Sequence, residues 1–264
     1  MSTPIRDRTR RQGMRQLLAN WSSLAAGAAL MVPAGGALAQ ALGGEAYAAT
    51  SAVAAVVKVP APWYAPKALV WSRMRDTVPQ YESTPGLSFK AYAIAQADGR
   101  YGGLYLWKDL TSARAWFNTA WFERVEKERG AKADVQFYEV PVAIDNTPGG
   151  TPPQAGGAHV STLVTISLPV GISKARLVQE FQAAIPTYRA VPGLLRKHFI
   201  ITDDGRFGGI YLWKDRAAAD QWFNAAWQQR VRETYGSDAT VEWFDTAILT
   251  PSKLTANQPA VPGL

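Results

Sequence analysis

The sequence predicts an α+β fold made of two tandem ferredoxin-like repeats, each with the element order β-α-β-β-α-β. Segments 98–109 and 204–215 of the 264-residue chain are identical at all but two positions, and part of the likeness continues at a constant offset of 106. The same succession of apolar patterns surrounds both copies. Because each repeat spans about ninety residues, it is long enough to form a core of its own.

The repeats and the segments around them define the domain organisation. We predict an export signal at 1–39, a flexible lead-in at 40–54, a first repeat at 55–145, a linker at 146–160, a second repeat at 161–250 and a tail at 251–264. Proline and glycine are frequent in the linker, which is typical of a segment without a core.

Each repeat opens with a predicted strand and helix. Short runs rich in β-branched residues, 56–59 and 163–168, each precede a proline and predict the strands. Segments 66–78 and 173–185 predict the helices, and apolar residues in the second of them recur at helical spacing. Ser173 is a typical N-cap residue for that helix.

The repeated motif lies in a predicted β-hairpin. Strands at 87–95 and 194–202 lead into Asp-Gly turns, and strands at 102–107 and 208–213 lead out of them. Each outgoing strand begins with two glycines, and no lysine-bearing glycine loop accompanies them. The glycine pairs therefore indicate a bulge or the close approach of another backbone, not a phosphate-binding loop.

A second helix and a last strand complete each repeat. The helices are predicted at 111–127 and 217–234, where aromatic residues recur at helical spacing and form one wide stripe. The last strands are predicted at 135–144 and 240–249.

The composition excludes several kinds of site and partner. The chain has no cysteine, which rules out disulfides, thiolate metal sites and a cysteine nucleophile, and two histidines are too few for a His-rich metal cage. We therefore predict no metal site. The net charge is +7, but residues 1–39 contribute +4 of it and neither repeat contains a basic run. This distribution argues against nucleic acid as a partner.

The N-terminus has the three parts of an export signal. An arginine-rich head precedes the moderately apolar segment 17–31, and Ala37-Leu38-Ala39 is a typical cleavage site. Segment 9–15 resembles a twin-arginine signal, although Gly13 leaves the general secretory route open. We predict a periplasmic or secreted protein that contacts the membrane only through an uncleaved signal, and a retained anchor is the alternative.

Segment 192–197 (PGLLRK), followed by 208–213 (GGIYLW), resembles the YdhR-like monooxygenase family of the dimeric α/β-barrel superfamily. The resemblance covers nearly all of the second repeat, and the first repeat matches less well in its opening strand and helix. It implies two ferredoxin-like units packed sheet to sheet into a barrel, with a pocket between each sheet and its helices. One chain would supply both units as a pseudo-dimer, since a tether raises the effective concentration of the second unit to about millimolar. A further homodimer is also open.

The resemblance also implies a reaction, the oxygenation of a small aromatic or quinol-like molecule by O2 without a cofactor. We expect His198 or Tyr211 to abstract a proton while Lys197, Arg206 or Asn224 stabilises the resulting anion. His198 corresponds to Ala91 in the first repeat, and this asymmetry indicates one active and one structural half. Because some relatives in the wider superfamily bind haem, haem ligated by His198 is the alternative.

Aromatic and amide side chains near the stripe are predicted to bind the substrate. They are Asn224, Trp213, Trp222, Phe223, Trp227, Asn118, Tyr105 and Trp121. The alternative is that the rings are ordinary core between helix and sheet and that the amides face solvent. Lys90 and Lys197 occupy matching strand positions, where each could stabilise a phenolate or lie on an exposed edge strand.

Two functions from different classes follow. The first is an exported, cofactor-independent monooxygenase acting on a small aromatic or quinol-like compound. The second is a non-catalytic periplasmic protein that binds a hydrophobic small molecule or haem, and the lack of a strong catalytic constellation in the sequence favours it.

Overall fold

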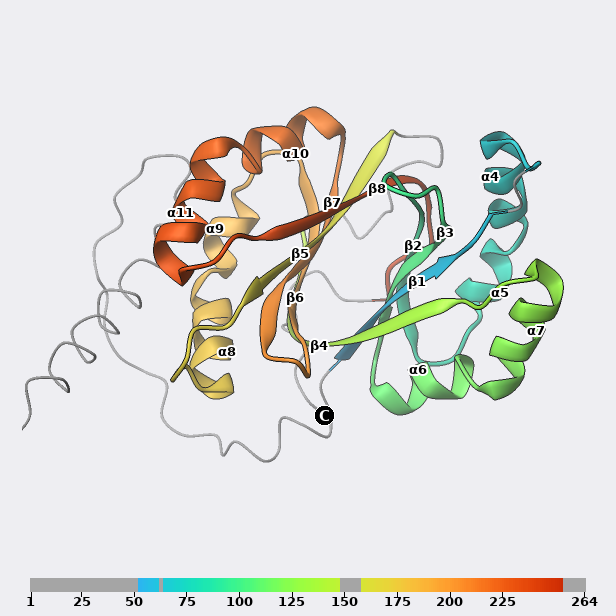
Figure 1. Cartoon of the computed structure of the whole chain (residues 1–264), viewed down its shortest axis with the longest axis horizontal. Coiled ribbons are helices and arrows are strands. Elements are labelled where there is room, and N and C mark those ends of the chain that lie inside the picture. The colour runs from blue at the N-terminus through green and yellow to red at the C-terminus, as the bar shows by residue number, and fades with distance from the viewer. Residues whose placement is uncertain (1–51, 62–63, 148–157, 254–264) are drawn as a thin grey trace, which may run out of the picture.

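The computed structural model describes residues 52–61, 64–147 and 158–253. Within these ranges eight strands close into a barrel, and helices cover it on two opposite flanks (Figure 1). The predicted α+β fold with two β-α-β-β-α-β units is confirmed. The predicted signal lies outside the described residues, as do most of the lead-in, of the linker and of the tail, so these segments stay predictions.

The two units repeat the same elements in the same order. The first unit contains β1 (Ala52–Val59), α4 (Lys67–Asp76), α5 (Val78–Glu82), β2 (Leu87–Ala95), β3 (Tyr101–Trp107), α6 (Leu110–Trp116), α7 (Thr119–Arg129) and β4 (Asp134–Asp145). The second contains β5 (His159–Ser167), α8 (Lys174–Ala183), α9 (Ile185–Arg189), β6 (Leu194–Ile201), β7 (Arg206–Trp213), α10 (Arg216–Trp222), α11 (Ala225–Tyr235) and β8 (Thr240–Leu249).

The strands follow the barrel order β1-β3-β2-β8-β5-β7-β6-β4. Each unit contributes four neighbouring antiparallel strands, and the units join where β2 pairs with β8 and where β4 pairs with β6. Closure leaves none of these eight strands with an unpaired edge, which is the usual way for a sheet of this size to avoid edge-to-edge association.

The predicted long second helices are each two helices, which corrects the ranges 111–127 and 217–234. The chain leaves the helix at Phe117, and Asn118 then caps α7 by accepting a hydrogen bond at Oδ1 from the Trp121 backbone N–H (2.9 Å). Asn224 caps α11 in the same way through Trp227 (2.9 Å). Asparagine favours this position because its short side chain binds free backbone donors.

Two other boundaries also differ from the prediction. β5 begins at His159, within the predicted linker, and the His159 Nδ1 lies 3.0 Å from the Lys214 carbonyl oxygen. The first predicted helices end early, at Asp76 and Ala183, and short proline-containing helices follow them. The Ser173 N-cap is confirmed, since its Oγ accepts from the Arg176 N–H at 3.2 Å.

The strands have two differently packed faces. The face inside the barrel carries mainly small and aliphatic residues, such as Ala54, Ala91 and Leu106. The face toward the helices carries most of the aromatic side chains, which pack against α6 and α7 in the first unit and α10 and α11 in the second. Because successive strand residues alternate between these faces, each position belongs either to the barrel interior or to the helix side.

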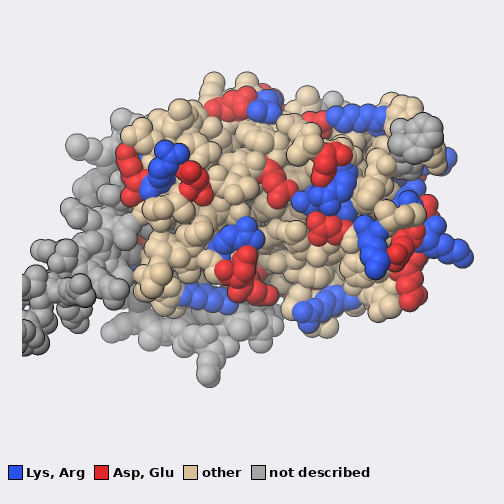
Figure 2. All heavy atoms as spheres, in the orientation of Figure 1, with Lys and Arg blue, Asp and Glu red and all other residues tan. Residues whose placement is uncertain are grey.

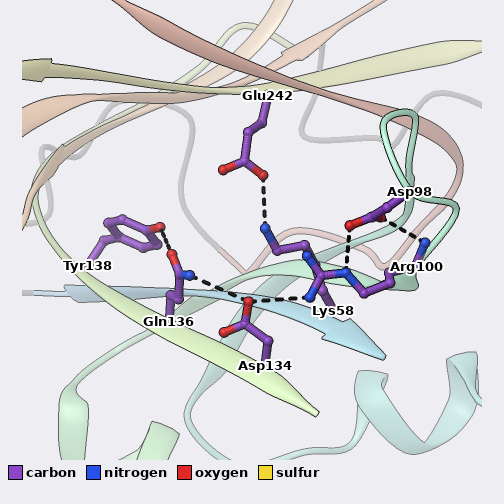
Figure 3. Close-up of polar contacts among 7 residues, drawn as sticks. All are labelled: Lys58, Asp98, Arg100, Asp134, Gln136, Tyr138 and Glu242. Atoms are coloured by element: carbon purple, nitrogen blue, oxygen red, sulfur yellow. Dashed lines mark hydrogen bonds and ion pairs between the residues drawn. The ribbon is translucent and has the colours of Figure 1, made fainter. Parts of the chain in front are cut away.

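Two ion pairs connect the units, one partly and one fully buried. Lys58 of β1 reaches Glu242 of β8 (Nζ to Oε2, 2.9 Å), and Figure 3 shows beside this pair a run of polar contacts from Asp98 through Arg100, Asp134 and Gln136 to Tyr138. Arg196 of β6 lies 3.0 Å from Asp145 of β4 (Nη2 to Oδ2). Each pair crosses from one unit to the other.

Figure 2 shows the charge distribution on one face of the protein. Lys and Arg side chains there alternate with Asp and Glu, and the described residues form no continuous basic patch on that face. None of the helices in the described ranges combines the length and the apolar character needed to cross a bilayer.

Candidate functional site

A pocket lies between the sheet and the helices in each unit, at equivalent places. The first pocket, in the first unit, has a cavity of about 490 Å³ and is bordered by α4, α5, α7 and the outer face of β1, β2 and β3. The second pocket, in the second unit, has a cavity of about 60 Å³. A cavity of the first size holds a small aromatic molecule, and one of the second size holds only a few waters.

Lys90 lies at the floor of the first pocket. The side chain is 3% exposed, and its Nζ lies over three tyrosine rings, 3.3 Å from the centroid of Tyr81, 3.7 Å from Tyr92 and 4.7 Å from Tyr105. Among the described residues, no carboxylate forms an ion pair with it. The pocket thus holds a buried amine surrounded by aromatic rings and hydroxyls.

Gly103 leaves room for this lysine. A Cβ atom at Gly103 would lie 3.0 Å from the Lys90 Cε and 2.9 Å from the Ala91 carbonyl oxygen. At the neighbouring Gly102 a Cβ would lie 2.0 Å from the Val57 carbonyl oxygen. The prediction of close backbone approach is therefore confirmed for the first glycine of the pair, and the second also accommodates the amine side chain.

Burial sets the protonation states in this pocket. Desolvation lowers the pKa of Lys90 well below its usual value, because burial disfavours the charged ammonium. Desolvation also raises the pKa of Tyr105 well above the usual value and raises that of Tyr81. Burial thus favours the uncharged amine and the protonated hydroxyls, and the Tyr105 hydroxyl donates to that of Tyr81 at 3.5 Å between oxygens.

Cationic side chains border the opening of the first pocket. Arg73 of α4 and Arg124 and Arg129 of α7 line it together with a single carboxylate, Glu128. All four are exposed. The rim therefore favours a ligand that carries negative charge or an acidic hydroxyl.

Aromatic side chains fill the second pocket. Phe181 stands where the first unit has the smaller Met74, and Tyr235 stands where it has Arg129, while Phe207 and its counterpart Tyr101 are both rings. The ring of Phe181 stacks on Phe199 with 4.6 Å between centroids, and Phe207 lies 5.1 Å from Tyr235. These rings occupy the volume that is open in the first unit.

A cage of three aromatic rings nevertheless surrounds the lysine in both pockets, with Phe199 in the second where the first has Tyr92. Lys197 Nζ lies 3.1 Å from the centroid of Tyr188, 3.9 Å from Phe199 and 4.6 Å from Tyr211. Desolvation lowers the pKa of Lys197 well below its usual value. The pockets thus differ in volume and in rim charge, not in the placement of the amine.

The structure brings some of the predicted site residues to pocket walls. Lys197, Tyr211 and Trp227 line the second pocket, and Tyr105 and Trp121 line the first. Lysines 90 and 197 are buried, so the alternative of an exposed edge lysine is wrong for both.

His198 does not join Lys197 in the second pocket. Neighbouring strand residues point to opposite faces, and His198 faces the barrel interior, 6.4 Å from the Phe89 ring. Burial and, to a lesser extent, the nearby Arg196 together lower its pKa to about 3. His198 was expected to act in that pocket as a base or as an axial haem ligand. This expectation is wrong, because the side chain lies on the other face of the sheet.

Arg206 and the two asparagines also lie away from both pockets. Arg206 is exposed at the hairpin turn, where its guanidinium pairs with Asp204 at 2.9 Å. Asn118 and Asn224 are exposed helix caps, and their amide N–H groups donate to Ala115 (2.9 Å) and Gln221 (2.7 Å) carbonyls. The expectation that these two asparagines donate hydrogen bonds inside a pocket is wrong. In each, the amide oxygen accepts from the helix backbone and the amide nitrogen donates to a backbone carbonyl.

The remaining rings of the predicted stripe pack as core. Trp213 is fully buried and stacks on Tyr211, with 5.8 Å between centroids and 8° between planes. Trp222 and Phe223 pack against Trp213 from the helix side. Trp213, Trp222 and Phe223 therefore form part of the ordinary core between helix and sheet, which was the alternative to a role in substrate binding.

Sequence reasoning missed most of the first pocket. Tyr81, Tyr92, Met74 and Arg73 were not among the candidates, although they line the larger cavity. A comparison of matched positions in the two repeats could have found it, because the second repeat has the larger ring at the position of Met74. The larger pocket therefore lies in the first half of the chain, whereas the active half was expected from the sequence to be the second.

Comparisons with known proteins support the fold. No protein-family model matches the sequence, and no curated protein matches it. The chain is similar to a solved structure from Fusobacterium nucleatum named as a putative monooxygenase, with a TM-score of 0.58, 11% identity, and coverage of 78% of this chain and 95% of that one. A structure of the same designation from Lactobacillus acidophilus has a TM-score of 0.50, 11% identity, and coverage of 76% and 96%. At this identity the likeness shows a shared fold.

Proposed function

We propose that the chain is a cofactor-independent monooxygenase that oxidises a small aromatic or quinol-like compound in the first pocket. One observation carries the proposal: a cavity of about 490 Å³ walled by aromatic rings has a buried, carboxylate-free lysine at its floor. The designation of two solved structures with this fold as monooxygenases supports the reaction class.

The pocket matches an aromatic molecule that carries an acidic hydroxyl. Apolar side chains such as Val57, Val70 and Val125 form much of the wall, and they would cover the faces of a planar ring. The arginines at the rim would attract an anionic or hydroxyl-bearing compound toward the opening. A substrate hydroxyl that reaches the floor would meet the Lys90 amine.

Lys90 would act as the general base. Its uncharged amine accepts the hydroxyl proton, and the resulting ammonium lies among three tyrosine rings whose faces stabilise a cation. The hydroxyls of Tyr81 and Tyr105 would donate to the phenolate oxygen. The residues thus convert a neutral phenol into an electron-rich anion inside an apolar cavity.

The substrate itself would supply the electrons for O2. A carbon–oxygen bond forms at the ring carbon para to the hydroxyl, which gives a hydroperoxide. The O–O bond then breaks as that carbon loses its proton, so one oxygen atom stays as a carbonyl and the other leaves as water. For 1-naphthol this converts substrate and O2 to 1,4-naphthoquinone and water.

Oxygen uptake with 1-naphthol and a panel of quinols tests the proposal. Lys90→Met should lower the rate by about a hundredfold or more, which is the usual contribution of a positioned base. Lys197→Met is the matched control, since it removes the same group from the filled pocket, and it should retain uptake. Uptake that survives in Lys90→Met but is lost in Lys197→Met or His198→Ala would move the reaction to the second half.

Binding without turnover is the second candidate. It is favoured by the first pocket's lining, in which Glu128 at the rim is the one carboxylate and histidine does not occur among the described lining residues. Under this alternative the wild-type protein would bind 1-naphthol, detected by quenching of tryptophan fluorescence, and would consume no oxygen with any compound of the panel.

Export of the protein is part of the proposal. The predicted signal at 1–39 would place the folded barrel in the periplasm or outside the cell. N-terminal sequencing of the mature protein from the periplasmic fraction would show a chain that begins at Gln40, and a chain that keeps its first residues would contradict cleavage.

A further inference from the structure

The buried amine in the first pocket has a second kind of chemistry available to it. A lysine amine attacks carbonyl carbon only when it is uncharged, and an exposed lysine with a pKa near 10.4 is uncharged in only about one molecule in 2500 at pH 7. Lys90 is held in a desolvated cage without an ion-pair partner among the described residues, at the floor of a cavity that is open to small molecules. Its position therefore combines burial that disfavours the charged ammonium with access from the cavity.

We propose that Lys90 is a Schiff-base nucleophile that condenses with the carbonyl group of a small aromatic aldehyde or ketone bound in the first pocket. This activity does not depend on the proposed oxygenation, because it needs neither O2 nor a change in oxidation state.

The condensation can be written with the groups present. The Lys90 nitrogen forms a bond to the carbonyl carbon, and a proton passes from that nitrogen to the carbonyl oxygen to give a carbinolamine. The carbon–oxygen bond then breaks as the oxygen takes up a second proton and leaves as water. The protonated imine that remains returns one proton to the donor to give the neutral imine. Tyr105 donates its hydroxyl proton toward Tyr81 at 3.5 Å, so a linked pair of hydroxyls borders the amine and can protonate the departing oxygen.

The cage also favours the product. A protonated imine carries its positive charge at the former Lys90 nitrogen, which lies 3.3 Å and 3.7 Å from the centroids of Tyr81 and Tyr92. Aromatic faces stabilise such a cation, and they do so more strongly in a desolvated site. Tyr92 is itself held in place by a 2.8 Å hydrogen bond to Thr77.

The second pocket provides a control within the same molecule. Lys197 has the same cage distances within a few tenths of an ångström, yet its cavity is about 60 Å³ and is closed by Phe181, Phe207 and Tyr235. A reaction that needs only an uncharged amine would label both lysines. A reaction that needs the pocket would label Lys90 alone.

Reductive trapping under anaerobic conditions tests the proposal. The full-length protein is incubated at pH 7 with 4-hydroxybenzaldehyde and sodium cyanoborohydride, and the modified lysines are mapped by peptide mass spectrometry. Labelling at Lys90 should exceed that at each exposed lysine by about tenfold or more, since each pKa unit by which burial lowers the pKa raises the uncharged fraction of an amine about tenfold. It should also exceed labelling at Lys197, because the second cavity of about 60 Å³ is too small for the aldehyde.

Two variants separate the pocket from the amine. Lys90→Met should abolish the major adduct. Met74→Phe keeps Lys90 but places in the first pocket the ring that Phe181 supplies in the second, and it should lower labelling of Lys90 to the level of Lys197.

Equal labelling of Lys90 and Lys197, or labelling confined to exposed lysines, would overturn the proposal. Undiminished labelling of Lys90 in a folded Met74→Phe protein would do so as well. Because trapping runs without O2, an adduct without oxygen uptake refutes the oxygenase alone, and oxygen uptake without an adduct refutes the Schiff base alone.

Discussion

The two halves of this barrel share a lysine cage and differ in what surrounds it. In the first half the amine of Lys90 faces a cavity of about 490 Å³ with three arginines at its rim. In the second half Lys197 also lies among three rings, with Phe199 in the place of Tyr92, but Phe181, Phe207 and Tyr235 leave a cavity of about 60 Å³. One architecture can therefore support either a ligand site or a packed core, and a few side chains distant from the amine decide which.

The largest expected effect concerns the ring that fills the second pocket. Phe181→Ala should destabilise the protein by about 3–5 kcal/mol, because it empties a fully packed site, whereas Met74→Ala should cost about 2 kcal/mol at the edge of an existing cavity. Urea unfolding followed by tryptophan fluorescence measures both. Equal losses would mean that the two pockets do not differ in packing as described.

An intermediate effect concerns the pH dependence of stability. Burial lowers the pKa of both lysines, so between the folded pKa and about 10.4 the unfolded chain binds more protons than the native one and stability rises with pH. Lys197→Met and Lys90→Met should each be more stable than wild type at pH 7 and should gain less between about pH 7 and 9. The difference should be larger for Lys197, whose cavity admits less water.

Urea midpoints at each pH provide the measurement, and the double variant Lys90→Met/Lys197→Met should show the shallowest rise. A wild-type midpoint that falls over this range, with the methionine variants unchanged, would contradict uncharged lysines in the native state.

The smallest expected effect concerns the asparagine N-caps of α7 and α11, which both halves share. Asn118→Ala and Asn224→Ala each remove an N-cap, and each should lower the free energy of unfolding by about 1 kcal/mol. Asn→Asp at the same positions keeps the acceptor and should largely restore stability. A cost several times larger at Asn224 than at Asn118 would show that the halves also differ outside their pockets.

The sequence was sufficient for the architecture because local patterns encode it. The repeated Asp-Gly turns, the alternation in the strands and the proline boundaries appear in both halves and predict the same element order twice. It was less informative about the helix break at Phe117, since the aromatic stripe keeps its helical spacing across the break. Asn118 was read as a pocket residue, although its preference for N-caps offered the correct interpretation.

The location of the candidate site was harder to predict for a physical reason. A cavity forms where side chains are too small to fill the space between helix and sheet. His198 and Ala91 differ in chemistry, and that difference carries no information about where such a space lies. His198 and Ala91 both face the barrel interior, so that difference lies on the wrong side of the sheet for either pocket. The informative pair was Met74 and Phe181, whose side chains differ in bulk.

Two ion pairs connect the unlike halves of the barrel, Arg196–Asp145 across the junction of β6 and β4, and Lys58–Glu242 between β1 and β8, which are not neighbouring strands. The first half contributes the cation Lys58 and the anion Asp145, and the second contributes the complementary Glu242 and Arg196. Two copies of the second half would set Glu242 against Thr165 and Arg196 against Pro251, and would leave the buried Arg196 without a carboxylate partner. The two pairs therefore favour association of the two unlike halves within one chain over association of two identical halves.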